Sequence, residues 1–435
     1  MSHSPDPPLR IVIQMNNART RIEERVLGSL DAEGLVRSVC DLIALPSVTG
    51  EENNAQLFIA SLMKEVGLGV DVWEIDLEAL RGSPHFSMGV YRKDGLGVVG
   101  SFGGGGRSLI LNGHIDVVSS GDESNWRHPP WKGTVEAGRL YGRGAVDMKG
   151  GLCSALYAIK ALRDSGVELD GRAMVESVVG EEDGGVGTLA TLLQGYKADG
   201  AIIMEPTELK VAPAQAGSHC FRIRIKGLSA HACVREEGVS ALDKFMPIYK
   251  TLTSLEAKRN SEVRDPLYTG YRLPIPLNIG VVKCGSWPSS VPEELEFEGR
   301  YGIGVDENVA EAHKAFENAV SIAAESDDWL RIHPPEIEWV GGQFNPARTS
   351  RDNLISTTLA EAYENATGCT AIYEGVTYGS DMRHLVNLGK IPTVLFGPGD
   401  VRLCHRPNEN VSIDELIKAA KTLALTIMRY CGINK

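Results

Sequence analysis

The chain lacks the features that mark secreted and membrane proteins. Its eight cysteines are dispersed and form no C-x-x-C pair, which in a chain of 435 residues indicates reduced thiols rather than a disulfide framework. No run approaches the roughly 18 apolar residues that a membrane span needs. The first residues, MSHSPDPPLR, contain no basic stretch followed by an apolar core. The sequence therefore predicts a cytoplasmic protein without membrane association.

Positive charge is also scarce. The chain has 44 lysines and arginines against 57 acids, a net charge of −13, and no run rich in Lys or Arg. This balance argues against nucleic acid as a partner and is most simply a means of staying soluble. The chain is long enough for two domains, and its 43% hydrophobic residues are ordinary for a globular protein.

Apolar strand patterns alternate with helix patterns over most of the chain. Runs such as SLILN, AMVESVV, AIIM and PTVLF suit strands of a sheet that is covered on both faces. A further strand is predicted over 86–92. Helices are predicted over 54–66, 150–166, 186–194, 352–366, 379–388 and 412–430. The alternation indicates an α/β domain with a mixed, mostly parallel sheet flanked by helices.

The pattern changes between about residues 218 and 332. FRIRIKG alternates apolar and basic residues, as a half-exposed strand does. The segments that follow give a β-α-β-β-α-β order, which is typical of a ferredoxin-like α+β module. We therefore predict an inserted domain at 218–332. The main domain is then formed by 1–217, with 1–30 as an N-terminal arm, and by 333–435.

Histidines and acids recur just after the predicted strands. In open α/β sheets the ligand site lies beyond the carboxyl ends of the strands. Carboxylates and imidazoles suit zinc, cobalt or manganese, and here they suffice for two ions that share one carboxylate. Such a centre indicates a hydrolase that activates water. The residues are His114, Asp116, Asp147, Glu181, Glu182, Glu205 and His405.

Each of these residues also has a simpler interpretation. A histidine beside an aspartate at a strand end, as at 114 and 116, is often a structural hydrogen bond, and Asp147 could cap a helix. In the functional interpretation His114 binds metal while Asp116 accepts its other N–H. Of the adjacent Glu181 and Glu182, one would bind metal and the other would move a proton, and their spacing leaves the assignment open.

From about residue 32 to 430 the chain resembles the dinuclear zinc aminoacylase and carboxypeptidase family. This family includes acetylornithine deacetylase, succinyl-diaminopimelate desuccinylase and glutamate carboxypeptidase. The length and the C-terminal motifs most resemble the acetylornithine deacetylase branch. The segments that carry the resemblance are, in order, NGHIDVV, GRLYGRGAVDMKGG, GEEDGG, MEPT, KGLSAHA, GSDMRHL, GPGD and HRPNENV.

The resemblance implies a zinc-peptidase-like catalytic domain, in which the inserted domain is a lid that also forms a dimer. Two zinc ions per subunit, with cobalt or manganese as possible substitutes, would be bridged by Asp147. Asp116 would orient a ligand, and Glu181 would be the general acid and base. The implied ligands are His114, Asp147 and Glu205 for one ion, and Asp147, Glu182 and His405 for the other.

The resemblance also implies contacts with substrate. Asn278 and Arg300 match lid positions that hold substrate oxygens, although Arg300 could equally be a surface arginine on an alternating strand. His231 matches a lid histidine that reaches the active site of the partner subunit, which implies a homodimer. The matching loop that would line the substrate pocket contains Gly379, Ser380 and Asp381.

These observations predict the deacylation of an N-acyl amino acid, in the manner of acetylornithine deacetylase. The alternatives are a succinyl-diaminopimelate desuccinylase, a dipeptidase or carboxypeptidase, and a deformylase of an N-formyl heterocyclic amine. An alternative from another class is a catalytically silent metal-binding protein on the same fold. The presence of every implied ligand together with Glu181 argues against silence.

Overall fold

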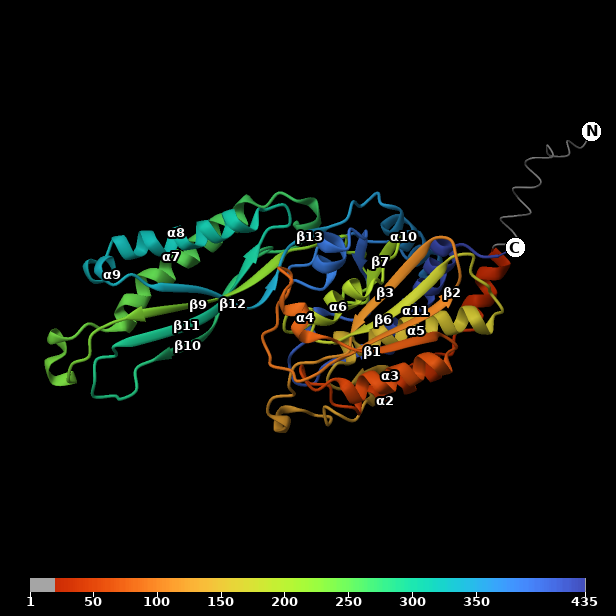
Figure 1. Ribbon diagram of the computed structural model, residues 1–435, viewed down its shortest axis with the longest axis horizontal. Helices are drawn as coiled ribbons and strands as arrows, with labels where there is room; N and C mark the ends of the chain where they lie inside the picture. Colours follow the sequence, from red (N-terminus) through yellow and green to blue (C-terminus); the bar gives the residue numbers. More distant parts are fainter. Residues whose placement is uncertain (1–19, 435) are drawn as a thin grey trace, which may run out of the picture.

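The computed structural model describes residues 20–434, so most of the predicted arm at 1–30 lies outside the described residues. The described chain forms two lobes, each built on its own sheet (Figure 1). We call the lobe with the six-stranded sheet the body. The lobe with the four-stranded sheet, residues 217–344, is the lid. Within residues 20–434, no helix combines the length and apolar character needed to cross a membrane.

The sheet of the body is mixed and mostly parallel, as predicted. Its strand order is β1-β2-β6-β3-β7-β14. The four strands from β6 to β14 run parallel, whereas β1 and β2 join antiparallel at one edge. The bounds are β1 (Gly69–Glu74), β2 (Leu96–Gly103), β3 (Ser108–His114), β6 (Arg172–Val178), β7 (Gly200–Ile203) and β14 (Thr393–Leu395).

Helices cover both faces of this sheet. They are α2 (Ala32–Ile43), α3 (Asn53–Glu65), α4 (Leu77–Arg81), α5 (Gly150–Asp164), α6 (Val186–Gln194), α10 (Leu354–Thr367) and α11 (Ile413–Cys431). On β6, Glu176 contacts Thr191 of α6, and the next residue, Ser177, contacts Gln56 of α3. Because successive strand residues point to opposite faces, α3 and α6 lie on opposite sides of the sheet. Two small sheets complete the body: β4 (Thr134–Glu136), β5 (Arg139–Tyr141) and β15 (Asn410–Ser412) form one, and β8 (Ala214–Gln215) and β13 (Ala347–Arg348) form the other.

The strand predicted over 86–92 is wrong, because this segment is an irregular loop. The backbone N–H of Val90 donates to Oδ2 of Asp183 at 2.7 Å, and the N–H of Gly89 donates to the main-chain oxygen of the same aspartate at 3.0 Å. These donors are therefore not available to a strand ladder. Arg92, at the end of this segment, is buried.

The helix predicted over 379–388 begins only at residue 382 and ends at Leu388. The preceding residues are held outside the helix by Gln215. Its Oε1 accepts hydrogen bonds from both the backbone N–H and the hydroxyl of Ser380. A side chain from another part of the chain thus sets the start of this helix.

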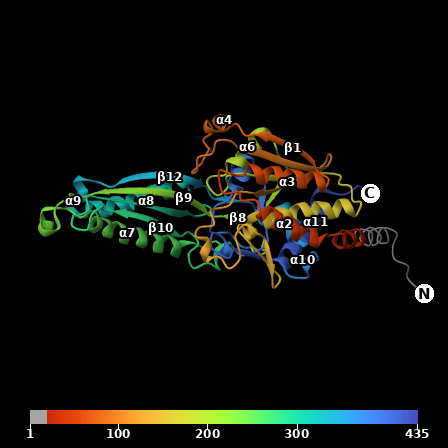
Figure 2. The same cartoon turned by 90° about the horizontal axis from the view of Figure 1, so that it is seen from below.

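The lid sheet is antiparallel throughout, with the order β10-β11-β9-β12. Helices lie along one of its faces (Figures 1 and 2). The elements are β9 (Gly217–Lys226), α7 (Ala241–Glu262), β10 (Leu277–Cys284), β11 (Glu294–Ile303), α8 (Val309–Glu325), α9 (Asp328–Ile332) and β12 (Glu336–Phe344). This is the predicted β-α-β-β-α-β order, although its last strand lies beyond the predicted boundary at 332. The lid has its own core, in which Phe221 packs on Phe316 with ring centroids 4.6 Å apart.

Candidate metal centre

The predicted ligands converge at the carboxyl ends of the parallel strands in the body sheet. His114 is the last residue of β3, and Glu205 comes two residues after β7. Glu182 lies in the loop after β6, and His405 lies in the loop after β14. Asp147 lies in a kinked segment, Ala145–Lys149, that leads into α5. Because β3, β6, β7 and β14 are parallel, their carboxyl ends bring together segments far apart in the sequence.

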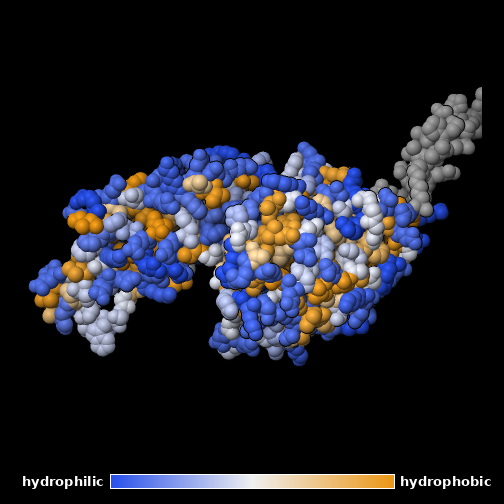
Figure 3. Space-filling model, viewed as in Figure 1, coloured by the Kyte–Doolittle hydropathy of each residue, from blue (hydrophilic) through white to orange (hydrophobic). Residues whose placement is uncertain are grey.

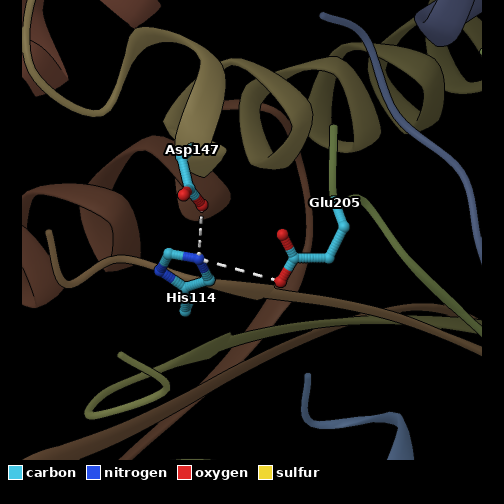
Figure 4. Close-up of side chains that lie close together, drawn as sticks. All are labelled: His114, Asp147 and Glu205. Atoms are coloured by element: carbon cyan, nitrogen blue, oxygen red, sulfur yellow. Dashed lines mark hydrogen bonds and ion pairs between the residues drawn. The ribbon is translucent and has the colours of Figure 1, made fainter. Parts of the chain in front are cut away.

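The five side chains form two groups that share Asp147. In one group, donor atoms of His114, Asp147 and Glu205 lie within 4.8 Å of one another, and Figure 4 shows these side chains pointing toward a common point. Asp147, Glu182 and His405 form the second group by the same measure. Oδ1 of Asp147 is 3.0 Å from Nε2 of His114, and Oδ2 is 3.2 Å from Nε2 of His405. Each oxygen of the shared carboxylate therefore faces a different histidine.

The donor set fits two divalent cations in both type and charge. Nitrogen and oxygen donors of this kind suit zinc, cobalt and manganese. Burial and the neighbouring Asp147 raise the pKa of Glu205 to about 8. Hydrogen bonds with Asp147 and Glu182 raise the pKa of His405 to about 10. The excess of negative charge thus makes Glu205 and His405 hold protons unusually strongly, and a bound cation would offset the same excess.

Asp116 supports the centre differently from the prediction. Nδ1 of His114 lies 2.8 Å from the main-chain oxygen of Asp116, and 3.7 Å from its carboxylate. The carboxylate instead accepts the backbone N–H groups of Glu181 and Glu182, each at 3.1 Å, and the hydroxyl of Thr49 at 3.2 Å. The main chain of Asp116 therefore orients the imidazole, while its side chain fixes the loop that carries both glutamates.

Glu181 lies beside both ligand groups but belongs to neither of them. Its side chain is buried and lines the same cavity as the ligands. Burial, reinforced by the charge of Glu205, raises the pKa of Glu181 well above that of an ordinary glutamate. A carboxyl group with a raised pKa next to a candidate metal centre can accept and return a proton near neutral pH.

The sequence analysis missed Glu409, which holds the shared aspartate. Its Oε1 accepts the backbone N–H groups of Val146 at 3.1 Å and Asp147 at 3.2 Å, and its Oε2 accepts a hydrogen bond from Arg143. The Glu409 side chain is fully buried. Its position four residues after His405, within the segment HRPNENV, was the available signal.

A cavity of about 290 Å³ opens over the ligands. Of the predicted substrate residues, Arg300 and Gly379 line it. Arg300 donates to the main-chain oxygen of Thr377 at 3.1 Å, and its Nε has no hydrogen-bond partner among the described residues. Burial lowers the pKa of Arg300, which indicates a partly desolvated guanidinium able to bind a substrate oxygen. The aromatic side chains of Phe344 and Tyr378 also line the cavity and were not predicted.

The other residues predicted to contact substrate do not line this cavity. Ser380 and Asp381 are fully buried outside the cavity lining, where Asp381 accepts a hydrogen bond from Thr188 at 2.6 Å. Asn278 is exposed on β10. His231 is exposed beyond the end of β9 that points away from the body, with its Nδ1 3.0 Å from Sγ of Cys233. One chain alone does not bring Asn278 or His231 to the candidate metal centre.

Comparisons with known proteins agree with this geometry. The family model described as Peptidase family M20/M25/M40 matches residues 110–429. The N-formyl-4-amino-5-aminomethyl-2-methylpyrimidine deformylase of Halalkalibacterium halodurans is 30% identical to the chain, over 95% of this chain and 98% of that protein. A probable succinyl-diaminopimelate desuccinylase of Staphylococcus aureus is 25% identical, over 88% and 94%. The structure of the dipeptidase Dug1p of Saccharomyces cerevisiae shares the fold, with a TM-score of 0.73 at 15% identity, over 94% of this chain and 98% of that one.

Proposed function

The chain belongs to peptidase family M20/M25/M40 and is a metallohydrolase, and from this we propose that it removes the acyl group from a small N-acyl amine by hydrolysing the amide bond. One observation carries the proposal: two ligand groups share Asp147, and Glu181 stands free beside them. This arrangement has the parts that amide hydrolysis needs, namely a place for two cations and a separate group that moves protons.

We propose zinc as the native metal, with cobalt or manganese as substitutes. His114 and Glu205 would hold one ion, Glu182 and His405 would hold the other, and Asp147 would bridge the two. When bound, such ions act as Lewis acids toward the acyl oxygen and lower the pKa of water. Glu409 and Asp116 would keep the ligands in place through the hydrogen bonds described above.

The proton transfers are assigned to Glu181. Its carboxylate accepts a proton from water as the water oxygen bonds to the acyl carbon. It then delivers this proton to the amine nitrogen as the C–N bond breaks, so that a free amine and a carboxylic acid result. The hydrogen bond from its backbone N–H to Asp116 holds Glu181 in position through both steps.

Different residues that line the cavity favour two different classes of substrate. Arg300 could bind the carboxylate of an N-acyl amino acid, as in acetylornithine deacetylase or a desuccinylase. Phe344 and Tyr378 could stack on a ring, which favours an N-formyl heterocyclic amine as the second candidate. The 30% identity with a pyrimidine deformylase supports this second candidate.

We also propose a homodimer that forms through the lid. β10 is an edge strand of the lid sheet and exposes Val281 and Val282, while α7 exposes Leu242, Met246 and Tyr249. Figure 3 shows apolar patches on the lid lobe. Exposed edge strands and apolar patches are common sites of association. In a dimer of this kind, His231 would contribute to the active site of the partner subunit.

A substrate panel tests the proposed reaction. Zinc-loaded enzyme is incubated with N-acetyl, N-formyl and N-succinyl amino acids, dipeptides and an N-formyl aminopyrimidine, and products are detected by mass spectrometry. We expect one acyl class to be cleaved by the wild type and not by Glu181→Ala. Binding of these compounds without any cleavage, in a protein with two ions bound, would instead support the catalytically silent alternative.

Subunit mixing tests the dimer. His231→Ala and Glu181→Ala chains are each expected to be inactive alone. A mixed dimer contains one site in which both the intact Glu181 and the partner's intact histidine are present, so mixing should restore part of the activity. If activity stays absent although native mass spectrometry shows that subunits have exchanged, the histidine does not act across the dimer.

A further inference from the structure

The loop 180–185, which carries Glu181 and Glu182, rests on the segment that was mistaken for a strand. Asp183 of this loop accepts the N–H of Val90 with its carboxylate and the N–H of Gly89 with its main-chain oxygen. The carboxylate is also 3.2 Å from Nη2 of Arg92. The irregular segment 86–92 is therefore hydrogen-bonded directly to the loop that carries Glu181, the candidate general base.

Arg92 is the charged centre of this contact. Its side chain is fully buried, and its Nη2 also lies 3.2 Å from Oε1 of Glu52, which is buried as well. A Cβ atom on Gly180 would lie 2.6 Å from this same nitrogen, so the main chain of the loop passes directly over the guanidinium. The φ of Gly180 is +69°, a conformation that glycine adopts easily. The loop 180–185 therefore packs closely against the guanidinium of Arg92 and leaves no room for a side chain at Gly180.

The contact is a costly way to stabilise a fold. Nε and Nη1 of Arg92 have no hydrogen-bond partner among the described residues. A buried guanidinium whose nitrogens are incompletely paired contributes little net stability, since desolvation offsets its ion pairs. Strained or costly arrangements of this kind occur where position matters more than stability.

We propose that Arg92 is a positioning residue for catalysis. It keeps Glu181 in place by contacting Asp183 and Gly180 of the loop 180–185. Asp116 holds the loop through the backbone N–H groups of Glu181 and Glu182, and Arg92 contacts the residue on either side of this pair, Gly180 and Asp183. Arg92 contacts no ligand atom and does not line the cavity. The inference rests on the proposed function, because it assigns Arg92 a role in the proton transfers of Glu181.

The test compares Arg92→Met with the wild type at saturating zinc and with the best substrate of the panel. We expect kcat to fall by about 10- to 100-fold, the usual effect of removing a group that supports a metal-site residue. KM should change little, because the walls of the cavity come from other segments. Arg92→Lys should recover part of kcat, since an ammonium can pair with Glu52 and Asp183 but cannot lie flat beneath Gly180.

Hydrogen exchange gives a measure that does not depend on turnover. The backbone N–H groups of Glu181 and Glu182 are bonded to Asp116, so a displaced loop should exchange them faster in Arg92→Met. The matched control is Arg259→Met, which removes another buried arginine, paired with Glu307 in the lid. This control should lower stability while leaving kcat and the exchange of the loop unchanged.

The outcomes separate the two proposals. Wild-type inactivity on the whole panel refutes the proposed function, whereas faster exchange of the loop in Arg92→Met would still support its anchoring by Arg92. If the wild type is active and Arg92→Met retains kcat and loop protection, the positioning role is refuted. A loss of kcat that appears at limiting zinc and is absent at saturating zinc also refutes it, because Arg92 would then act on metal affinity. If Arg92→Met does not fold, Glu52→Gln/Arg92→Met removes the buried ion pair of Arg92 with Glu52 as a whole and is tested in the same way.

Discussion

Charged side chains occupy different places in the two lobes. In the body, eight carboxyl groups are buried among the described residues, those of Glu52, Asp116, Glu176, Glu181, Asp183, Glu205, Asp381 and Glu409. On the sheet of the lid, by contrast, charged side chains lie on the open face. There β9 carries basic residues and its neighbours β11 and β12 carry acidic ones, as in the pairs of Arg224 with Glu296 and Glu338 at 2.9 Å.

The two kinds of charge differ in what they contribute: the buried carboxyl groups of the body serve activity, and the exposed ion pairs of the lid contribute little to either activity or stability. Buried carboxyl groups are expensive to desolvate and shift one another's pKa, which is useful for chemistry. Exposed cross-strand pairs cost little and contribute little, and the lid is held mainly by its aromatic core. Substitutions of charged residues should therefore affect activity in the body and at Arg300, which lines the cavity. They should hardly affect activity or stability at the exposed cross-strand pairs of the lid.

The largest effect is expected for Asp147→Ala. Because Asp147 belongs to both ligand groups, its removal should abolish stable binding of both ions and bring activity below detection. Metal content after dialysis, measured by elemental mass spectrometry, checks this prediction, and circular dichroism serves as the control for folding. A folded variant that retains two ions would show that the carboxylate does not bridge them.

Glu181→Gln should separate chemistry from metal binding within the body. The amide keeps the size of the side chain but cannot accept a proton. We expect kcat to fall by about 10²- to 10⁴-fold, the usual contribution of a general base, with two ions still bound. Steady-state kinetics at saturating substrate, with metal analysis of the same sample, provides the measurement. A kcat close to that of the wild type would remove Glu181 from the mechanism.

The buried His219 of the lid, which pairs with the half-buried His313, should make the stability of the lid depend on pH. Nδ1 of His219 lies 2.8 Å from Nε2 of His313, and its Nε2 faces Oδ1 of Asn345 at 3.0 Å. Burial and the neighbouring His313 lower the pKa of His219 to about 4, from an ordinary 6.5. Between pH 6.5 and 4, His219 therefore binds a proton in the unfolded chain but stays neutral in the folded chain.

The free energy of unfolding should accordingly fall as the pH drops from 6.5 toward 4, by on the order of 1–3 kcal/mol from this residue. Denaturant unfolding of the wild type and of His219→Gln at several pH values provides the test. The difference between the two proteins isolates the contribution of His219. Equal pH dependence of both would show that the histidine gains its proton as easily in the folded state.

The smallest effect is expected for Arg224→Ala on the open face of the lid. Its ion pairs are partly exposed, so the midpoint of denaturant unfolding should hardly move, and should move less again at high salt. Activity should stay at the wild-type level. Denaturant titrations at two salt concentrations measure the change. A loss of stability as large as that caused by truncating a core residue such as Phe316 would mean that surface charges support the lid as strongly as its core does.

The sequence predicted the parts of this molecule that depend on local pattern. Buried strands, the β-α-β-β-α-β order and the acids and histidines at strand ends were all visible, because burial and strand direction leave a periodic signal. The bonding of Asp116 and the loop at 86–92 were not visible. Both depend on which distant N–H group a carboxylate reaches, as Asp183 does with Val90, and spacing along the chain carries no such information.

The shared carboxylate of Asp147 has a thermodynamic consequence. Each of its oxygens faces a different histidine, so an ion in either group would fix the rotation of the same side chain. The conformational entropy lost in that step is lost only once. The second ion therefore meets a ligand already in place, and the two binding equilibria are linked and reciprocal. Repulsion between the two cations opposes this gain, so the affinities of the first and second ion together report which of the two effects is larger.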